Sequence, residues 1–358
     1  MATLAEFTEL PVVDLARWHA GDEERRALAD EVRRICHEVG FFQLVGHGIA
    51  VEDRLAYFDQ LARFFALPDE VKGQIDKARS PHFRGWEQIG TERTDGHVDH
   101  REQVDLLTEH APRERDTLPA YLRLDGPNPW LPEVELPGFR DVVEGFIGRL
   151  EALATEVMEV LSAALGLAPG HLTDYFGERP LSLVKLIHYP ETPPGGAGVN
   201  AHHDTGFITL LMQHQVSGLE VENAAGEWVP VPPRDDAFVV NLGEMLQTIT
   251  GNYFVATNHR VIAHADRLSS AYFAGPDLGT ALTPLPLAPE YAEAVAASPR
   301  HAGAGFMSRH DEILAGATGR HSAAAASYGE QMWNYYLRSY PEVVRAHYPD
   351  QMGQRVTS

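Results

Sequence analysis

Three side chains able to bind a metal stand in two short segments of the sequence. The segment VNAHHDTGFITLL carries His202 and Asp204 just before an apolar run, and NHRVIAHADRLSSAYF carries His259. Side chains alternate along an extended segment, so we expect His202 and Asp204 on one face and His203 on the other. Two imidazoles and one carboxylate form a facial set with open positions, which iron(II) needs for O2 and an organic ligand. The spacing therefore predicts an iron(II) site.

A candidate anion site follows closely after His259. Arg267 and Ser269 are separated by one residue at the start of an aromatic-rich run, so they share one face of an expected strand. An arginine fork beside a hydroxyl suits a carboxylate, which it binds through charge-assisted hydrogen bonds. Tyr189, in the run KLIHYP, either lines this site or packs as a core tyrosine. The pattern predicts a metal with a carboxylate anchor beside it.

Chance matches compete with the metal-site interpretation, because the chain has 18 histidines and H-x-D is a short motif. The order of the elements favours the site: H-x-D enters a strand, H-R-V follows, and R-x-S precedes an aromatic strand. A register shifted by one residue would make His203 the ligand and pair it with Thr205, a poor metal ligand. His264 falls in an expected hairpin turn and is predicted to lie on the surface.

The first zone of the chain, to about residue 175, is predicted to be mainly helical. Asp22 can cap one helix, and Gly40 stands where a left-handed residue would end it. Cys36 falls on the apolar stripe of that helix, so we expect a packed and inert thiol. The other expected elements of this zone are a buried strand at Phe41–Ile49 and helices at Leu55–Leu67 and Val142–Gly166.

The middle zone, about residues 180–276, consists of short runs rich in β-branched and aromatic residues, separated by Gly, Pro, Asn and Asp. Strands at even spacing without helices between them predict an antiparallel barrel or jelly roll. The candidate metal and anion sites both lie in this zone. A Pro- and Ala-rich stretch follows, and after it we expect an aromatic helix around Gln331–Tyr340.

The charge, the apolar runs and the cysteine count argue against several classes of partner, metal site and location. The net charge of −22 argues against a nucleic acid or an anionic membrane. No run approaches the roughly 18 apolar residues that span a bilayer, and the N-terminal segment lacks the pattern of a signal peptide. A single cysteine rules out a disulfide framework, a thiolate zinc site and an iron–sulfur cluster. We expect a cytoplasmic protein.

In the metal-site and anion-site motifs described above, the chain resembles the isopenicillin N synthase-like family of non-haem Fe(II)/2-oxoglutarate-dependent dioxygenases. The resemblance extends over nearly its full length. The stretches LPVVDL, EVGFFQLVGHGI, FFALPDEVK and FRGWE resemble the N-terminal module of that family, and H-x-D, H-R-V and R-x-S resemble its catalytic barrel. The resemblance implies a mainly β fold with flanking helices. That fold is a double-stranded β-helix (jelly-roll) barrel with a helical N-terminal module and a C-terminal helix.

The same resemblance divides one integrated unit into four parts. They are an N-terminal dioxygenase module at 1–120, support helices at 121–179, the Fe(II)/2-oxoglutarate barrel at 180–280, and an insertion or lid with the C-terminal helix at 281–358. Two departures from the family pattern stand out. The interval from His259 to Arg267 is short, which requires a tight hairpin, and the stretch Thr280–Ala326 has no family motif, so a lid and a plain insertion both remain open.

The resemblance also implies an oxidoreductase that uses Fe(II), 2-oxoglutarate as cosubstrate, and O2. A small-molecule substrate would be hydroxylated, desaturated or cyclised with release of succinate and CO2. The implied iron ligands are His202, Asp204 and His259, and the implied cosubstrate residues are Arg267, Ser269 and Tyr189. No catalytic residue beyond the metal ligands is expected.

A segment near the barrel resembles the substrate-facing loop of the family. Its candidate substrate-binding residues are Arg84, Trp86, Glu87 and Glu92, and each of them could equally belong to an ordinary surface loop. Their polarity suggests an amino-acid-derived or natural-product substrate.

Three other functions stay open. An iron oxidase of the isopenicillin N synthase type would need no 2-oxoglutarate and could use Arg267 for a substrate carboxylate. A metal-dependent hydrolase would use His203 and Asp204 as a doublet, which belongs on a helix, whereas this segment has strand character. A jelly-roll binding module would bury its inward charges without purpose, at a high energetic cost. The sequence has no G-x-G-x-x-G, P-loop, G-x-S-x-G or H-E-x-x-H motif to support nucleotide-dependent or other hydrolase chemistry.

Overall fold

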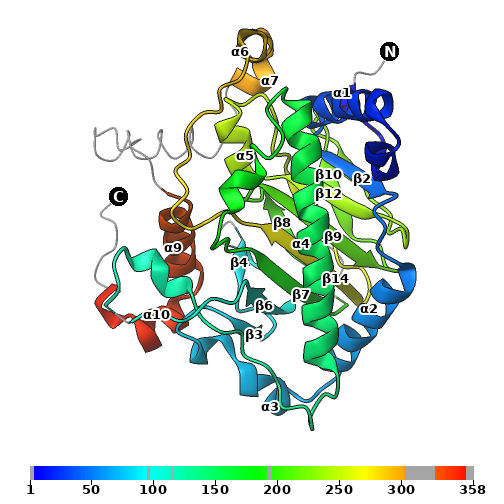
Figure 1. Ribbon diagram of the computed structural model, residues 1–358. Helices are drawn as coiled ribbons and strands as arrows, with labels where there is room; N and C mark the ends of the chain where they lie inside the picture. The colour runs from blue at the N-terminus through cyan, green and yellow to red at the C-terminus, as the bar shows by residue number, and fades with distance from the viewer. Residues whose placement is uncertain (1–3, 95–96, 115, 192–195, 303–326, 352–358) are drawn as a thin grey trace.

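The computed structural model describes residues 4–94, 97–114, 116–191, 196–302 and 327–351 (Figure 1). Within them, one eight-stranded sheet, the major sheet, contains in spatial order β1 (Val12–Asp14), β2 (Phe41–Val45), β12 (Phe238–Leu242), β9 (Ile208–His214), β14 (Arg267–Ala274), β7 (Leu183–Tyr189), β6 (Glu102–Leu107) and β3 (Gly85–Glu87). A four-stranded minor sheet contains β11 (Trp228–Pro230), β10 (Leu219–Glu222), β13 (His259–Val261) and β8 (Val199–His202). A separate antiparallel pair consists of β4 (Arg93–Thr94) and β5 (His97–Val98).

The helices surround the two sheets (Figure 1). Their bounds are α1 Asp22–Glu38, α2 Val51–Phe65, α3 Asp69–Lys72, α4 Phe139–Ala164, α5 Glu244–Ile249, α6 Pro289–Ala297, α7 Pro299–Ala302, α9 Tyr328–Ser339 and α10 Pro341–His347. Of the described residues, no helix is both long enough and apolar enough to cross a bilayer.

The jelly-roll architecture predicted from the sequence is confirmed, with one correction to its closure. Among the described residues the two larger sheets are both open, and no closed barrel forms. Strands from the N-terminal zone extend the major sheet on both sides, because β2 pairs with β12 and β6 pairs with β7, both antiparallel. The sheets therefore combine strands that lie far apart in the sequence, which the even spacing of the middle zone does not reveal.

The long helix expected near Val142–Gly166 is α4, which packs on the outer face of the major sheet against β9 and β14, with α1 and α2 beside it (Figure 1). Its buried stripe includes Phe146, Leu150 and Val157 at helical spacing. This layer covers one face of the major sheet with apolar side chains. The opposite face is thereby left for the polar groups described below.

The expected N-cap at Asp22 is wrong in detail. Helix α1 begins at Asp22 with Gly21 as its N-cap and no side-chain capping bond, so the carboxylate lies in the first turn, where it interacts favourably with the helix dipole. The other end agrees with the prediction: Gly40 has φ +73° and its N–H donates to the carbonyl of Ile35 at 3.0 Å. Cys36 is fully buried, and burial raises the pKa of its thiol, so it is an inert core residue.

The expected hairpin between His259 and Arg267 is also wrong. Strand β13 pairs with β10 and β8 of the minor sheet, whereas β14 pairs with β7 and β9 of the major sheet. The short link at 262–266 therefore carries the chain from one sheet to the other, with His264 exposed as predicted. The middle zone is likewise interrupted by the short helix α5, which the pattern of strands had not predicted.

The C-terminal zone contains two consecutive helices, α9 and α10, where one was expected. Ser327 caps α9 in a capping box with Glu330. In the part of the Thr280–Ala326 stretch that is described, α7 follows α6 and contacts the C-terminal end of α1. There His301 hydrogen-bonds the carbonyl of His37 at 2.8 Å and stacks on its ring. Residues 303–326, which the lid interpretation includes, lie outside the described residues.

Candidate metal centre and anion site

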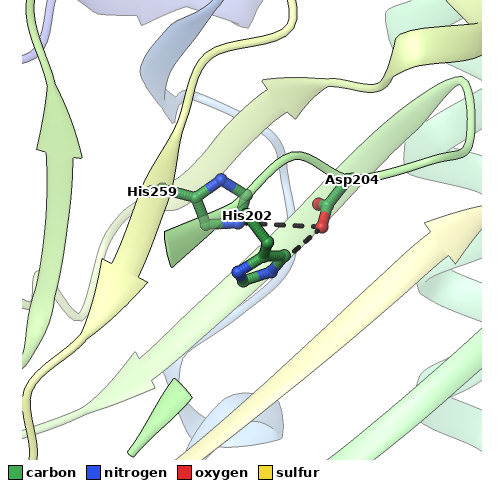
Figure 2. Close-up of side chains that lie close together, drawn as sticks. All are labelled: His202, Asp204 and His259. Atoms are coloured by element: carbon green, nitrogen blue, oxygen red, sulfur yellow. Dashed lines mark ion pairs between the residues drawn. The ribbon is translucent and has the colours of Figure 1, made fainter. Parts of the chain in front are cut away.

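Two strands of the minor sheet and the loop after one of them bring together three side chains that could bind a metal. His202 ends β8 and His259 begins β13, and the two residues face each other as a register pair. Asp204 follows β8, and its Oδ1 lies 3.6 Å from Nε2 of His202 and 3.7 Å from Nε2 of His259 (Figure 2). One ligand atom from each residue fits within 4.8 Å of the others. This convergence suits a single metal ion.

Backbone carbonyls fix the orientation of both imidazole rings. Nδ1 of His202 bonds the carbonyl of Asn200 at 2.8 Å, and Nδ1 of His259 bonds that of Thr257 at 3.1 Å. Each Nδ1 must carry the proton, which leaves the lone pair of Nε2 directed at the shared space. Burial lowers the pKa of both imidazoles, to about 4 for His259, so both rings are neutral near neutral pH.

The two oxygens of the Asp204 carboxylate likewise have different partners. Its Oδ2 accepts hydrogen bonds from Thr209 Oγ1 at 2.5 Å and from Asn241 Nδ2 at 2.8 Å. Its Oδ1 faces the two imidazoles. Each of the three candidate ligands is thus oriented by a second group, which is the usual arrangement around a protein-bound metal. The donor set, two imidazole nitrogens and one carboxylate oxygen, fits iron(II) with positions left open.

Arg267 is a buried cation that has only neutral partners among the described residues. Its guanidinium donates to the carbonyl of Val216 at 3.3 Å, to Ser269 Oγ at 3.3 Å and to Gln213 Oε1 at 3.1 Å. It lies over the ring of Tyr189, 4.9 Å from the centroid. The side chain is 1% exposed, and burial lowers the pKa of its guanidinium. A buried charge without a counter-charge is costly, so this environment suits an anionic ligand.

A small apolar cluster connects the anion site to the metal centre. It consists of Ile187, Tyr189, Val199, Val261 and Ala263. Val199 and Val261 pair with each other on the same two strands that carry the metal ligands. Tyr189 and the paired residue Arg267 approach from the major sheet. The candidate metal ligands and Arg267 therefore lie near each other, between the minor and the major sheet.

The four candidate substrate-binding residues are all held by other protein groups. Arg84 is fully buried and donates to the carbonyls of Leu107, Thr108 and Leu124. The Trp86 Nε1 donates to Glu102 at 2.8 Å, and Glu87 accepts from Lys77 at 2.6 Å.

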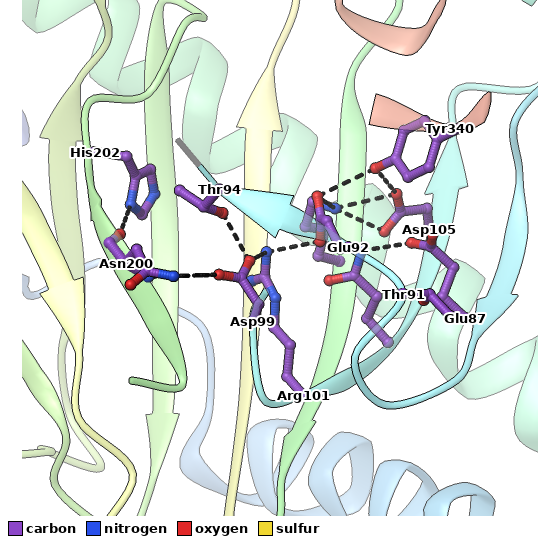
Figure 3. A network of polar contacts seen from close by, with 12 residues as sticks. Glu87, Thr91, Glu92, Thr94, Asp99, Arg101, Asp105, Asn200, His202 and Tyr340 are labelled. Carbon is purple, nitrogen blue, oxygen red and sulfur yellow. Dashed lines mark hydrogen bonds and ion pairs between the residues drawn. The ribbon is translucent and has the colours of Figure 1, made fainter. Parts of the chain in front are cut away.

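Glu92 belongs to a buried polar network that extends to Arg101, Asp99 and Asn200 and ends at His202 (Figure 3). Glu87 belongs to the same network, because Lys77 bonds both Glu87 and Asp105, and Lys185 bonds both Asp105 and Glu92. His203, the alternative ligand, is not part of the three-residue cluster. A separate hollow of about 260 Å³ on the α4 side of the major sheet contains none of the candidate residues.

Several residues around the site were not predicted from the sequence. Thr209, Gln213 and Asn241 support the metal ligand or the buried arginine from neighbouring strands. One signal was present: Asn241 is a polar residue inside the apolar run AFVVNL, and a buried polar side chain requires a partner. Thr209 and Gln213 stand in a strand where such residues are unremarkable, so their roles follow from the three-dimensional structure alone.

A jelly roll with two histidines and a carboxylate at one end and a buried arginine beside them is the architecture of a non-haem iron oxygenase. Residues 10–133 match the family model of the non-haem dioxygenase in morphine synthesis N-terminal region, and residues 180–276 match that of the 2OG-Fe(II) oxygenase superfamily. A 2-oxoglutarate-dependent dioxygenase from Gibberella zeae is 36% identical over 265 residues, 72% of this chain and 69% of the relative.

A further relative and two solved structures point to the same family. Clavatol oxidase claD from Penicillium crustosum is 31% identical over 298 residues, 77% of this chain and 88% of the relative. The crystal structure of a full-length Neurospora crassa protein in complex with alpha-KG has a TM-score of 0.67 and 26% identity, covering 77% of this chain and 88% of that one; a second structure of the same Neurospora protein also contains thymine. The chain belongs to the Fe(II)/2-oxoglutarate-dependent dioxygenase family. It is an oxidoreductase that uses Fe(II), O2 and 2-oxoglutarate, so the dioxygenase interpretation prevails over the alternatives.

Proposed function

We propose that His202, Asp204 and His259 hold the iron(II) of this dioxygenase. The observation that carries the assignment is the division of donor atoms: both Nδ1 atoms bond backbone carbonyls, so both Nε2 atoms and Oδ1 of the carboxylate remain for the metal. Bound iron(II) supplies the reduction of O2 that is coupled to decarboxylation of 2-oxoglutarate and to oxidation of the substrate. The protein contributes the neutral imidazoles and the oriented carboxylate.

Arg267 and Ser269 are proposed to bind the far carboxylate of 2-oxoglutarate, with Tyr189 packed against the guanidinium. The buried cation replaces the hydration that the carboxylate loses, and the hydroxyl adds a second donor. Gln213 holds the fork in place through Nη2, at 3.1 Å. Since the apolar cluster connects this residue pair to the metal strands, one small molecule could reach from the arginine to the iron ligands.

The substrate is proposed to be a small organic molecule of natural-product or amino-acid-derived type. Support comes from relatives, one of which is named for clavatol oxidation and another of which is described in complex with thymine. We also propose that the segments at 1–120, 121–179, 180–280 and 281–358 act as one unit, because N-terminal strands pair directly with barrel strands in the major sheet. A cytoplasmic setting is proposed from the single, buried cysteine.

Metal content and cosubstrate dependence test the assignment. His202→Ala and His259→Ala should lose iron binding and turnover, whereas the matched control His203→Ala should keep most of both. Succinate formation and O2 uptake should require 2-oxoglutarate. An inactive, iron-free His203→Ala together with an active His202→Ala would overturn the ligand set, and O2 uptake that coupled to substrate oxidation without 2-oxoglutarate would overturn the cosubstrate.

A further inference from the structure

The buried carboxylate of Asp99 is not one of the proposed metal ligands. It bonds Asn200, and Asn200 in turn bonds the proposed ligand His202. Asp99 follows β5 directly and is 0% exposed. Its Oδ1 accepts hydrogen bonds from the side-chain amide of Asn200 at 3.2 Å and from the backbone N–H of Asn200 at 3.5 Å (Figure 3). Its Oδ2 accepts from Thr94 Oγ1 at 2.6 Å and from Arg101 Nη2 at 3.2 Å. Both oxygens of Asp99 therefore have fixed directions.

Asn200 connects this carboxylate to the iron ligand. Its side chain is bound by Asp99, and its backbone carbonyl accepts the hydrogen bond from Nδ1 of His202 at 2.8 Å. Any rotation of the Asn200 peptide would move that acceptor, and the imidazole would turn with it. The direction of Nε2 toward the metal thus depends on how firmly Asn200 is held.

The sheet itself restrains Asn200 weakly. Strands β8 and β13 pair at His202–His259 and at Val199–Val261, but the register shifts between these two pairs. Asn200 lies inside this irregularity, where the ladder of backbone hydrogen bonds is disrupted. On its other side, β4 lies against β8, so the segment that carries Thr94 and Asp99 is the neighbour able to supply the missing restraint.

Arg101 balances the charge of Asp99 and anchors it to a larger network. Its Nη2 also bonds Glu92 at 2.7 Å, and Glu92 accepts hydrogen bonds from Tyr335 and Tyr340 at 3.2 Å each. A buried carboxylate without a cation would be costly, whereas one paired in this way can stay in place as a rigid support. A purely structural role would explain the pairing with Arg101, but not the contact with the residue that orients the iron ligand.

We propose that Asp99 is a positioning residue that acts through Asn200 to aim Nε2 of His202 at the iron. The proposal rests on the proposed function, because it takes His202 as an iron ligand. It concerns the coordination of the metal and leaves the binding of 2-oxoglutarate by Arg267 unaffected. Removing a group that orients a metal ligand typically weakens metal binding about 10–100-fold, and we expect the lower end of this range because Asp99 acts through one intervening residue.

Cobalt(II) titration of the metal-free full chain tests the proposal without turnover. Asp99→Ala and Asn200→Ala should weaken Co(II) binding about tenfold and change the visible absorption of the bound Co(II), since that spectrum reports ligand geometry. Asp99→Asn, which keeps an oxygen acceptor for the Asn200 amide, should fall between these variants and the parent chain. The half-saturating concentration of 2-oxoglutarate should change less than about twofold in Asn200→Ala, because its partners differ from those of Arg267.

Asp105→Asn is the matched control. Asp105 is an equally buried aspartate in the same network, bound by Lys77 at 2.6 Å and Lys185 at 3.1 Å. It should lower the melting temperature while leaving the affinity and spectrum of Co(II) unchanged. Equal loss of Co(II) affinity in Asp105→Asn and Asp99→Asn would overturn the proposal, as would parental affinity and spectrum in a folded Asn200→Ala. Parental Co(II) binding by His202→Ala would instead refute the proposed ligand set.

Discussion

The side-chain amide of Asn241 donates a hydrogen bond of 2.8 Å to Oδ2 of Asp204. Asn241 lies on β12 of the major sheet, whereas Asp204 follows β8 of the minor sheet, so this bond joins the two sheets at the metal centre. Thr209 on β9, the neighbour of β12, donates to the same oxygen at 2.5 Å. Together they direct the other oxygen, Oδ1, toward the two imidazoles.

Removing these donors should weaken the metal site without removing a ligand. Thr209→Val and Asn241→Leu each preserve approximate side-chain volume and delete one hydrogen bond to Asp204. We expect each to reduce metal affinity by about 10–100-fold, since partners of metal ligands contribute on that scale. Iron retained after dialysis against a chelator, compared with the parent chain, measures the effect. Thr209→Ser keeps the hydroxyl and serves as the control; unaltered iron retention in both deletion variants would contradict the role.

Arg267 should determine the affinity for 2-oxoglutarate. A hydrogen bond to a charged group contributes about 1.5–3 kcal/mol, and about 1.4 kcal/mol corresponds to a factor of ten, so Arg267→Ala should weaken 2-oxoglutarate roughly ten- to more than a hundredfold. Arg267→Lys should lie between, because it keeps the charge but loses the fork. Ser269→Ala should cost less, about 0.5–1.5 kcal/mol.

Succinate formation against 2-oxoglutarate concentration measures these effects, with iron content checked in each variant. Iron content should remain, because the guanidinium is not a metal ligand. An unchanged half-saturation in Arg267→Ala would rule out the anchor. The structure adds that Arg267 packs on Tyr189, so thermal stability must be compared to separate lost packing from lost binding.

The sequence predicted those parts of the site that depend on local geometry. His202 and Asp204 are two residues apart, and so are Arg267 and Ser269, so their common orientation follows from the alternation of an extended chain. The supporting contacts of Thr209 and Asn241 join strands that are distant in sequence, and local alternation carries no information about which strands become neighbours. The same limit explains why the crossing from β13 to β14 was mistaken for a hairpin.

The loop around Arg84 shows a second limit of prediction from the sequence. A resemblance to a substrate-facing segment identifies where a loop runs, but the environment of each side chain depends on what the rest of the chain packs around it. Arg84 ends beneath carbonyls contributed by β6 and by the segment before α4. Its four hydrogen bonds, including one to Asn128, make it a buried clamp between segments.

Arg84→Met should therefore lower stability and leave ligand binding unaffected. The substitution keeps much of the side-chain volume but leaves the carbonyls of Thr108 and Leu124 without this donor, whereas the carbonyl of Leu107 still accepts from Asn128 Nδ2 at 2.9 Å. Each buried unsatisfied group costs about 1–3 kcal/mol, so we expect a loss of about 2 kcal/mol or more in the free energy of unfolding. Urea denaturation monitored by tryptophan fluorescence measures it. If the variant instead kept parental stability and raised the substrate KM, Arg84 would be a substrate residue after all.

His188 should give the fold a measurable dependence on pH. Its Nδ1 lies 2.8 Å from Glu102 Oε1 and its Nε2 lies 2.9 Å from Asp266 Oδ2, so only the protonated ring can donate to both carboxylates. Burial alone would lower the pKa of His188, but the two carboxylates outweigh it and the pKa is raised. The unfolded chain titrates near the ordinary value of about 6.5. Stability from this contact is therefore fully present below about pH 6.5 and is lost as the pH rises through the raised folded-state value.

The melting temperature of the parent chain should fall between about pH 6 and pH 9 by more than that of His188→Gln, while the exposed control His264→Gln should follow the parent. Parallel melting curves for the parent and His188→Gln across this range would show that the imidazole remains neutral in the folded protein.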